Sequence, residues 1–580
     1  MSYFKTKNIL GKFEISGFGG IDLSTPAIEG KCTDMVNLRI LPDRSIVKRN
    51  GFREMFALSE DVRGVLSGNF DGGFKLFIVA GSTLYKFTTD TGMLKAIGNI
   101  GTQSGPVTLF CYNGKVYVID GAEIFEIRDD ALHVTAGYAP LVGKDWGSNY
   151  HGAIHEALNI LTPKGRISYI VDNPPTAFLS TYYDVDTVDA VYVNGDLRDK
   201  ETYGLDPRLR ALNVSGLEAG DRVLVYYTFA RSTKERERLS KNPYAMVFGG
   251  INNSRVFMWG GDDKNRMFAS APAAYQSVEE AEAVFANCGG LYFPEQNDFC
   301  VGDGKHEIKA VSRHYDRLLI FTSGETWMAD SEVSSSQSFP LTRINTDVGC
   351  AALGAVAKCG NDPISVGPRD IYRWTSNTDT LEDCNAYVIS DKIKALLPKS
   401  FFEDVKVFTD RYNQEILFAY RDGDVGRVLV YSIPREEWYF YDGVTADCFF
   451  EGASALGFIN GRKVCFFMPN LKKDMLSNGS VKDISGHCTY SANSFGHPSR
   501  KKRVSGVMGV GELGKGELQI TFESDSGVAN TVSFAGAGTD NTECFYKRLR
   551  GERFKNSQIK ISTDNTASQR IYSLTVTVRA

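Results

Sequence analysis

The chain has 580 residues, too many for one compact core, and its 42% hydrophobic and 12% aromatic residues exclude a disordered protein. Its formal charge of −5, from 65 basic and 70 acidic residues, lacks the basic excess typical of proteins that grip nucleic acid. The 57 glycines have no collagen period and indicate many tight turns, so we expect an all-β chain with a few short helices.

Residues 1–60 are expected to form an N-terminal arm with one hairpin. The first residues lack the apolar run of a signal peptide, and no apolar stretch is long enough to span a membrane, so we expect no membrane anchor. The 11 cysteines include no CxxC pair, which favours reduced core residues in a protein made in a cytosol.

From residue 61 onward an apolar strand, a small turn and a second strand ending in aromatics recur along the chain. "FKLFIVAGSTLYKF" (74–87), "GKVYVIDGAEIFEI" (114–127) and "RLLIFTSGETWMAD" (317–330) are clear copies. Outside one gap, the copies return roughly every 40 to 60 residues, a period that matches the four-stranded blades of a β-propeller. We therefore expect six to eight blades, formed by residues 61–145 and 241–480.

A single blade cannot bury both of its faces, so blades stack and bulky side chains fill the wedge between neighbours. We expect the aromatics at the strand ends to pack between blades, with a ligand-binding role as the alternative. The tryptophans concerned are Trp259, Trp327, Trp374 and Trp438.

Between residues 146 and 240 the blade pattern stops. The segment "VDAVYVNGDLRDKETYGLD" alternates apolar and polar residues around turn dipeptides, which predicts a small β-sandwich inserted at a hairpin tip. The charged stretch 231–242 is expected to return the chain as a short exposed helix. Two further helices are expected, one over 277–287 and one over 390–400 with Ser390 or Asp391 as its N-cap.

Residues 481–580 are expected to form a C-terminal β-sandwich that is locally basic. The run "RKKR" (500–503) is its densest part, and it allows two interpretations: a nuclear or nucleic-acid signal, or a contact with an acidic partner. We favour the partner contact. The candidate interface consists of Arg500, Lys501, Lys502, Arg503, Arg548 and Arg550.

Three patterns resemble cofactor or metal sites without completing them. Gly509, Gly511 and Gly514 form a GxGxxG that precedes a strand, whereas a dinucleotide site needs a helix there. His151 and His155 have the spacing of metal ligands but lack the glutamate of a metalloprotease, so surface histidines are the alternative. The carboxylates of "DVDTVD" (184–189) lack the glycine and distal glutamate of a calcium loop. We expect no cofactor and no resident metal.

The sequence contains only part of the residue pattern that a sialidase-type glycosidase requires. "SGETW" (323–327) is similar to the Asp-box turn of sialidase propellers, with Glu325 in place of the aspartate. A sialidase also requires three arginines around a carboxylate and a Tyr–Glu pair, and the sequence does not tell whether Arg317, Arg369 and Arg373 converge. Glu436 and Glu437 are adjacent on a strand and so point to opposite faces. We expect no catalytic residues and no enzyme activity.

Several segments, in order along most of the chain, resemble the β-propeller tail nozzle, tail hub or head-stabilisation proteins of short-tailed bacteriophages. The stretches "LNILTPKGRISY" (158–169) and "LYFPEQNDFCVGDGKHEIKAVSRHYDRLLIFTSGETWMAD" (291–330) carry part of this resemblance. The stretches "VYVNGDLRDKETYGLD" and "AGDRVLVYY" resemble the repeating β-module of phage fibres and hubs. The opening motif contributes Gly19, Gly20, Pro26, Asp34, Asn37, Arg49 and Gly51.

The resemblance implies a structural virion protein assembled in the cytoplasm of a bacterial host. Such proteins form a homo-oligomeric ring, commonly a hexamer, below the portal and adaptor. The ring closes the DNA channel, conducts double-stranded DNA at ejection and docks distal tail or fibre proteins. We expect acidic residues and polar loops to line the passage, so that DNA passes without specific binding, and the basic C-terminal domain to meet a neighbouring tail protein.

Two other functions stay open at this stage. A propeller that binds glycans or hydrolyses them, in the manner of a sialidase, would serve host adhesion. A cellular kelch-like scaffold is the third, although the regular Gly-Gly doublets of kelch repeats are missing.

Overall fold

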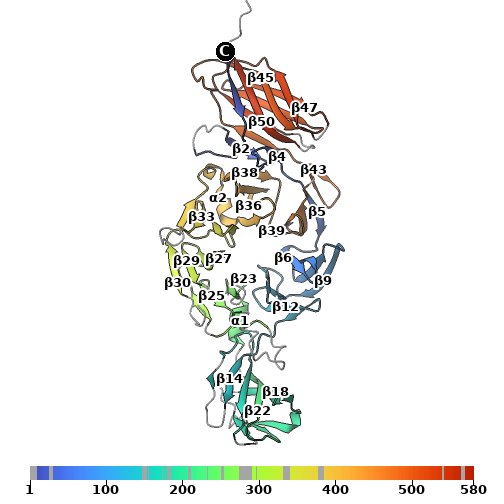
Figure 1. Cartoon of the computed structure of the whole chain (residues 1–580), viewed down its shortest axis with the longest axis vertical. Helices are drawn as coiled ribbons and strands as arrows, with labels where there is room; N and C mark the ends of the chain where they lie inside the picture. Colours follow the sequence, from blue (N-terminus) through green and yellow to red (C-terminus); the bar gives the residue numbers. More distant parts are fainter. Residues whose placement is uncertain are drawn as a thin grey trace, which may run out of the picture. The chain divides into compact units, whose positions relative to one another are not determined.

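The structure is a computed structural model. It describes residues 9–24, 30–146, 153–154, 156–172, 174, 176–178, 185–206, 211–230, 233–249, 254–272, 290–295, 297–330, 340–376, 385–469, 471–538, 541–563 and 569–579. Nearly all regular structure in these residues is β (Figure 1). The chain forms two compact units, unit 1 from Met1–Val62 and Asp347–Ala580, and unit 2 from Arg63–Thr346. No helix in the described ranges is long and apolar enough to cross a membrane.

Unit 2 contains four blades, each a four-stranded antiparallel meander. Tight turns connect the strands, as at Asn113–Gly114, where both residues have positive φ angles that this dipeptide tolerates. The strands are β6 (Val62–Phe70), β7 (Gly73–Ala80), β8 (Thr83–Thr88) and β9 (Met93–Asn99); β10 (Thr108–Tyr112), β11 (Lys115–Ile119), β12 (Ile124–Arg128) and β13 (Ala131–Val134); β23 (Tyr244–Phe248), β24 (Arg255–Trp259), β25 (Arg266–Ala269) and β26 (Asp298–Cys300); and β27 (Ile308–His314), β28 (Arg317–Thr322), β29 (Thr326–Asp330) and β30 (Leu341–Asn345).

Unit 1 contains three more four-stranded antiparallel meanders, two of which are parts of longer sheets. Together with unit 2 this makes seven blades in the described part of the chain, within the range expected from the sequence, and the fold is a β-propeller. The strands are β31 (Val356–Cys359), β32 (Asp362–Val366), β33 (Ile371–Thr375) and β34 (Asn385–Val388); β35 (Lys406–Asp410), β36 (Glu415–Asp422), β37 (Val425–Ser432) and β38 (Glu437–Asp442); and β39 (Cys448–Glu451), β40 (Leu456–Asn460), β41 (Lys463–Phe467) and β5 (Phe52–Ala57).

Apolar side chains from adjacent blades form shared cores. In unit 2 one core joins the first blade to the second, for example Val79 with Val118, and another joins the third blade to the fourth, for example Met267 with Ile320. These contacts bury the faces that a lone blade exposes, which is why the hairpins recur with aromatic ends.

A β-sandwich is inserted between the second and third blades of unit 2. Its larger sheet has the order β15-β14-β16-β22-β18-β19, its smaller sheet has the order β17-β21-β20, and both contribute to one core. The elements are β14 (Leu141–Trp146), β15 (Ala153–Ile154), β16 (Lys164–Ile170), β17 (Thr176–Phe178), β18 (Val185–Val193), β19 (Asp196–Leu197), a 3₁₀ turn (Lys200–Thr202), β20 (Tyr203–Asp206), β21 (Ala211–Val214), β22 (Arg222–Phe229) and α1 (Lys234–Ser240).

The C-terminal β-sandwich belongs to unit 1 and is continuous with a blade. Its second sheet follows β38 through β2 (Cys32–Val36) in the order β38-β2-β44-β49-β46-β47, and its first sheet has the order β3-β4-β50-β45-β48, with β1 on β50. The other strands of the sandwich are β1 (Ile9–Ile15), β3 (Leu38–Ile40), β4 (Ile46–Lys48), β44 (His487–Tyr490), β45 (Arg503–Glu512), β46 (Glu517–Ser524), β47 (Ala529–Ala535), β48 (Glu543–Arg548), β49 (Ser557–Ser562) and β50 (Arg570–Arg579). Two more strands, β42 (Lys473–Met475) and β43 (Val481–Asp483), extend the sheet of the last blade beyond β5.

The expected separate arm over residues 1–60 is wrong for the described part of that segment. A β3–β4 hairpin is present, but β1 and β2 lie in the two sheets of the C-terminal sandwich and β5 is the outer strand of the last blade. The partners of these strands lie at the far end of the chain, so local pattern gave no sign of the pairing.

The helices differ from expectation in two places. α1 forms within the charged stretch, but Leu239 and Ser240 are buried rather than exposed. The helix expected over 390–400 is instead a 3₁₀ turn (Lys394–Leu396) followed by α2 (Lys399–Asp404). The Ser390 hydroxyl bonds to Ile371 N and to Asp370, so it fixes a strand end and caps no helix. The helix expected over 277–287 lies outside the described residues.

Candidate functional site: a basic end and two buried joints

Basic side chains gather at one end of the C-terminal sandwich. β45 begins at Arg503, β50 ends at its register partner Arg579, and β48 ends at Arg548, so the antiparallel order brings all three to the same end. The loop at 550–556 joins them through a bridge between Lys502 and Phe554. We call this surface the basic end, and it consists of Arg500, Lys501, Arg503, Arg548, Arg550, Arg553, Lys555 and Arg579.

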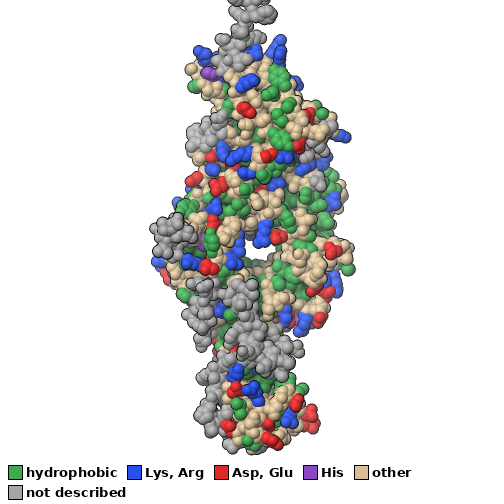
Figure 2. Space-filling model, viewed as in Figure 1, with side chains coloured by type: hydrophobic (Ala, Val, Ile, Leu, Met, Phe, Trp, Pro, Cys, Tyr) green, Lys and Arg blue, Asp and Glu red, His purple; other side chains and the backbone are tan. Residues whose placement is uncertain are grey.

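The cations of the basic end have no acidic partners in the described structure. None of its eight side chains makes an ion pair there, whereas arginines of the blades, such as Arg373 with Asp362 at 2.9 Å, are commonly paired. Residues 481–580 hold 14 basic and 9 acidic residues, within a chain of net charge −5. Figure 2 shows Lys and Arg side chains around the end of the sandwich where Figure 1 marks the C-terminus. An uncompensated cluster of this kind favours an anionic partner.

Lys502 does not belong to this surface, and its place in the expected interface is wrong. Its side chain is buried and its Nζ donates to the carbonyl oxygens of His497 at 2.7 Å, Arg500 at 3.2 Å and Lys555. Burial lowers the pKa of Lys502. Its function is to hold two loops together, while the other five predicted interface residues are half-buried or exposed.

Gly20, Asn37, Arg49 and Gly51 of the opening motif form a buried joint in unit 1, whereas Pro26 lies outside the described residues. A Cβ on Gly20 would lie 2.5 Å from the carbonyl oxygen of Trp438, so only glycine fits against this strand. The Gly20 N–H donates to Glu437 at 3.0 Å, and Lys31 pairs with the same carboxylate. Glu437 is therefore a structural anchor for the N-terminal segment.

Asn37 and Arg49 extend this joint toward the last blade and the C-terminal sandwich. Asn37 has φ of 54°; its Oδ1 accepts from Arg49 Nε at 2.9 Å, and its Nδ2 donates to Ser485 O at 2.9 Å. Arg49 also makes a two-point ion pair with Asp474. A Cβ on Gly51 would lie 2.0 Å from the carbonyl oxygen of Lys473.

A second buried joint fixes the base of the inserted sandwich. Arg166 donates to the hydroxyl of Tyr138 at 2.7 Å, and that hydroxyl lies 3.1 Å from Glu156. Asn159 donates to Tyr138 O and Leu291 O and accepts from two backbone N–H groups. Asn159 and Arg166 both lie in the segment 158–169 that the sequence analysis singled out.

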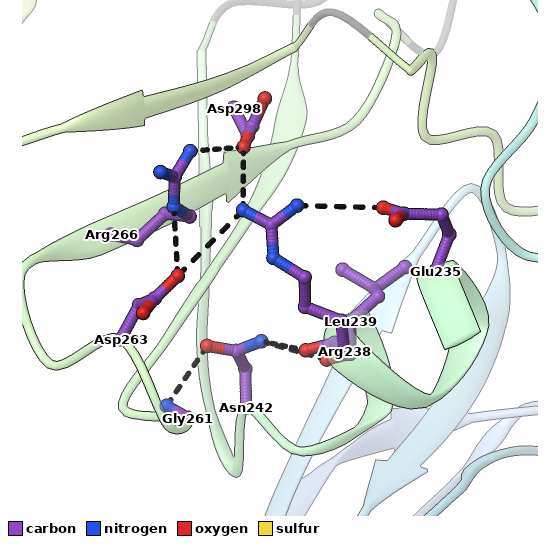
Figure 3. A network of polar contacts seen from close by, with 8 residues as sticks. All are labelled: Glu235, Arg238, Leu239, Asn242, Gly261, Asp263, Arg266 and Asp298. Carbon is purple, nitrogen blue, oxygen red and sulfur yellow. Dashed lines mark hydrogen bonds and ion pairs between the residues drawn. The ribbon is translucent and has the colours of Figure 1, made fainter.

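Helix α1 strengthens the same joint where the insert returns to the propeller (Figure 3). Arg238 Nη2 lies 3.2 Å from Asp298 and 3.7 Å from Asp263, both in the third blade. Asn242 donates to the carbonyl oxygens of Arg238 and Leu239, both at 2.9 Å, and accepts from the backbone of the blade. On the other side, Arg236 contacts the second blade. The helix thus connects two blades and the insert.

The four predicted packing tryptophans are buried or half-buried among blade residues. Trp259 lies in a core with residues of two blades, and Trp327 packs against that core. Trp438 Nε1 donates to Ile389 O, just after the preceding blade, at 3.1 Å. Trp374 is fully buried and donates to Ser365 Oγ in its own blade.

A buried cluster in unit 1 has residue types that occur in a sialidase site, but the cavity beside it is too small for a sugar. Glu415 accepts from Arg39 at 2.7 Å, from Tyr439 at 2.8 Å and from Tyr441 at 3.2 Å. The cavity beside it has about 20 Å³, room for a water molecule and not for a sugar ring. Burial raises the pKa of both phenols, the opposite of what a tyrosine nucleophile needs. Sequence patterns do not reveal this cluster, because Arg39 lies 376 positions from Glu415.

The remaining sequence candidates are placed as follows. Gly509 and Gly511 lie on strand β45. The expected glycine-rich hairpin is wrong, because the next strand, β46, lies in the other sheet of the sandwich. Glu325 accepts from the Trp327 indole at 3.0 Å. His151, His155 and Asp184 lie outside the described residues, and Asp189 lies 3.5 Å from Lys164.

Comparisons with known proteins add little about function. No protein-family model matches the sequence, and no curated protein matches it. Among solved structures, BBS1N in its complex with ARL6DN is 10% identical, with 73% of this chain and 98% of that chain covered at a TM-score of 0.36. The Dos1 propeller is 8% identical, with coverage of 73% and 96% and a TM-score of 0.34. The exo-β-1,3-galactanase of Phanerochaete chrysosporium is 8% identical, with coverage of 57% and 95% and a TM-score of 0.23. Because these TM-scores are low, the assignment of the propeller fold depends on the observed sheets and not on the similar structures.

Proposed function

We propose that this chain is a non-enzymatic structural component of a short-tailed bacteriophage tail, of the nozzle or hub type. Copies of it form a ring, of about six by the resemblance, below the portal and adaptor. The ring closes the DNA channel, conducts DNA at ejection and docks other tail proteins. The protein is assembled in the host cytoplasm and resides in the virion.

One observation carries this proposal: several of the motif residues behind the resemblance lie in buried joints. Gly20, Asn37, Arg49 and Gly51 lock the N-terminal segment into unit 1, and Asn159 anchors the insert. Residues that hold sheets together supply rigidity, which a channel needs when DNA is driven through it. The basic end supplies a docking surface for another tail protein.

The proposal is tested by mixing the purified full chain with the portal–adaptor complex and imaging the mixture in negative stain. We expect ring-shaped particles on the portal axis, and antibody labelling of virions at the tail. The ring should bind duplex DNA more weakly than about 1 μM at physiological salt, because a conducting channel must release its cargo.

Turnover of fluorogenic glycosides, together with no assembly on the portal, would instead support the host-adhesion glycosidase. The cavity beside Glu415 makes this outcome unexpected, since a sugar ring does not fit there. Tight DNA binding by the ring would contradict the channel function directly.

A further inference from the structure

We infer that strand β48 and the basic end bind an extended acidic segment of another protein, which adds to the sheet as a further strand. This inference rests on the proposed function and identifies the chemistry of the docked partner. It uses a strand edge, an exposed apolar pair and the unpaired cations, which all meet at one place on the C-terminal sandwich.

The first element is an unoccupied edge. β48 pairs with β45 through Val507↔Lys547 and the neighbouring residues, and no strand in the described part of the chain pairs with its other side. The edge is well supported from behind: Phe545 contacts Phe534 of the opposite sheet at a ring distance of 4.6 Å, and Lys547 Nζ donates to Ser533 O. A strand edge held in this way offers a row of backbone donors and acceptors to a partner about 4.8 Å away.

The second element is an exposed apolar pair on the outer face of the same sheet. Tyr546 is 58% exposed and Met508, its direct cross-strand partner, is 44% exposed. The Tyr546 ring lies over Gly506, where a Cβ would be 3.2 Å from ring atoms, so the glycine lets the ring lie flat on the sheet. Tyrosine and methionine are enriched at protein interfaces, and a flat ring gives contact area at low entropic cost.

The third element is charge. Arg548 ends the strand and Arg550 follows it, and neither makes an ion pair in the described structure. A segment added along β48 would pass these two guanidinium groups, and alternate residues of a strand point to the same face. Acidic residues at alternate positions would therefore neutralise the arginines while their backbone extends the sheet.

The arrangement favours a protein partner over nucleic acid. Phosphates have no use for a ladder of backbone N–H and C=O groups, whereas an extended peptide satisfies both. An exposed tyrosine–methionine pair also suits a side chain better than a phosphate backbone. The chain as a whole carries −5, which opposes the approach of a long polyanion.

The test uses the full chain and three probes in fluorescence anisotropy. The first is a labelled octapeptide with alternating Glu and Val. The second is the same peptide with N-methyl groups on alternate residues, which removes the hydrogen bonds of one edge and keeps the charge. The third is a labelled DNA duplex. We expect saturable binding of the first probe and at least about tenfold weaker binding of the N-methylated one.

Variants locate the site. Arg548→Glu combined with Arg550→Glu should weaken peptide binding by about tenfold or more, since two attractions become repulsions. Lys515→Glu is the matched control: Lys515 is exposed, lies in the turn between β45 and β46 at the other end of the sandwich, and should leave binding within about twofold. Circular dichroism checks that each variant is folded.

Three results would overturn the inference: no saturable peptide binding up to about 1 mM, equal binding of the N-methylated peptide, or tighter binding of the duplex than of the peptide. These results are separable from the fate of the proposed function. If the chain is found at the virion tail axis but does not bind the peptide, only the strand addition is refuted. A chain that binds the peptide but forms no ring on the portal refutes the tail function alone.

Discussion

Arg49 and Asp474 lie 425 positions apart and form a two-point ion pair, with N–O distances of 2.8 and 3.0 Å, in which both side chains are almost fully buried. Asp474 also accepts the backbone N–H of Phe52, so it connects the start of β5 to the segment that follows the last blade. This pair is the centre of the joint between the two ends of the chain.

Replacing Asp474 with Asn should lower the free energy of unfolding of unit 1 by about 3–5 kcal/mol, because it leaves the Arg49 guanidinium buried without a charged partner. Urea unfolding followed by tryptophan fluorescence measures the change. The matched control is Asp61→Asn, which removes the exposed partner of Arg462 at 3.3 Å and should cost less than about 1 kcal/mol. Equal effects of the two variants would contradict the assigned function of the buried pair.

Gly51→Ala should destabilise the chain by about 3 kcal/mol or more, because the new Cβ would lie 2.0 Å from a backbone oxygen that cannot move freely. Gly204→Ala is the control, since no atom lies within 4 Å of the position that its Cβ would take. Thermal unfolding should show a lower midpoint for the first variant and an unchanged or slightly raised midpoint for the second.

Asn159→Ala should loosen the base of the inserted sandwich. The substitution removes four hydrogen bonds to backbone groups. The buried N–H groups of Leu161 and Phe293 then lose their partner, at a cost of about 1–3 kcal/mol each, whereas Leu291 O still accepts from Tyr138 N. Limited digestion with trypsin, followed by mass spectrometry, should show faster cleavage around residues 158–169. Asn69→Ala, at an exposed position of β6, should be digested like the original chain.

Lys502→Ala and Lys501→Ala should distinguish a residue that stabilises the fold from a neighbouring residue that is available for docking. The first removes a buried ammonium that bonds three carbonyl oxygens and should lower the free energy of unfolding by about 1–3 kcal/mol. The second removes an exposed cation and should leave stability within about 0.5 kcal/mol. Denaturant titration of both variants measures the difference in unfolding free energy. Equal stability would mean that Lys502 does not hold the two loops together.

Stability of unit 1 should fall in acid partly through Asp34. A hydrogen bond with His487, at 2.8 Å, holds the pKa of Asp34 below its ordinary value of 3.8. The folded state then binds this proton less tightly than the unfolded state. The contribution is therefore complete above the ordinary value and is lost as pH falls through the folded pKa. Asp34→Asn should show a shallower loss of unfolding free energy between about pH 5 and pH 3, and parallel curves would contradict this.

The parts of the fold that depend on neighbours in sequence follow from the sequence. Each blade hairpin is set by an apolar alternation and a turn such as Asn113–Gly114, and these signals act over a few residues. The six basic residues at 500–503, 548 and 550 likewise lie in one predicted domain. Antiparallel pairing of its strands brings most of them to the same end.

The long-range pairings do not follow from such signals. β5 completes a blade with β41, and β2 pairs with β44, but nothing in these short strands specifies partners that lie hundreds of residues away. Lys501 and Lys502 lie in one basic run, but Lys502 is buried and donates to carbonyl oxygens that include Lys555 O, which lies 53 positions away. Tertiary packing therefore overrides composition at this site.

The pairing of early strands with strands that lie hundreds of residues later affects how the protein folds during translation. β1 is translated more than 550 residues before its partner β50, and β5 is translated long before its partner β41. At about 5–20 residues per second, roughly 20–80 s separate the synthesis of β5 from that of β41. Over that interval β5 lacks its native partner, and unit 1 cannot complete its fold before β50 has been synthesised.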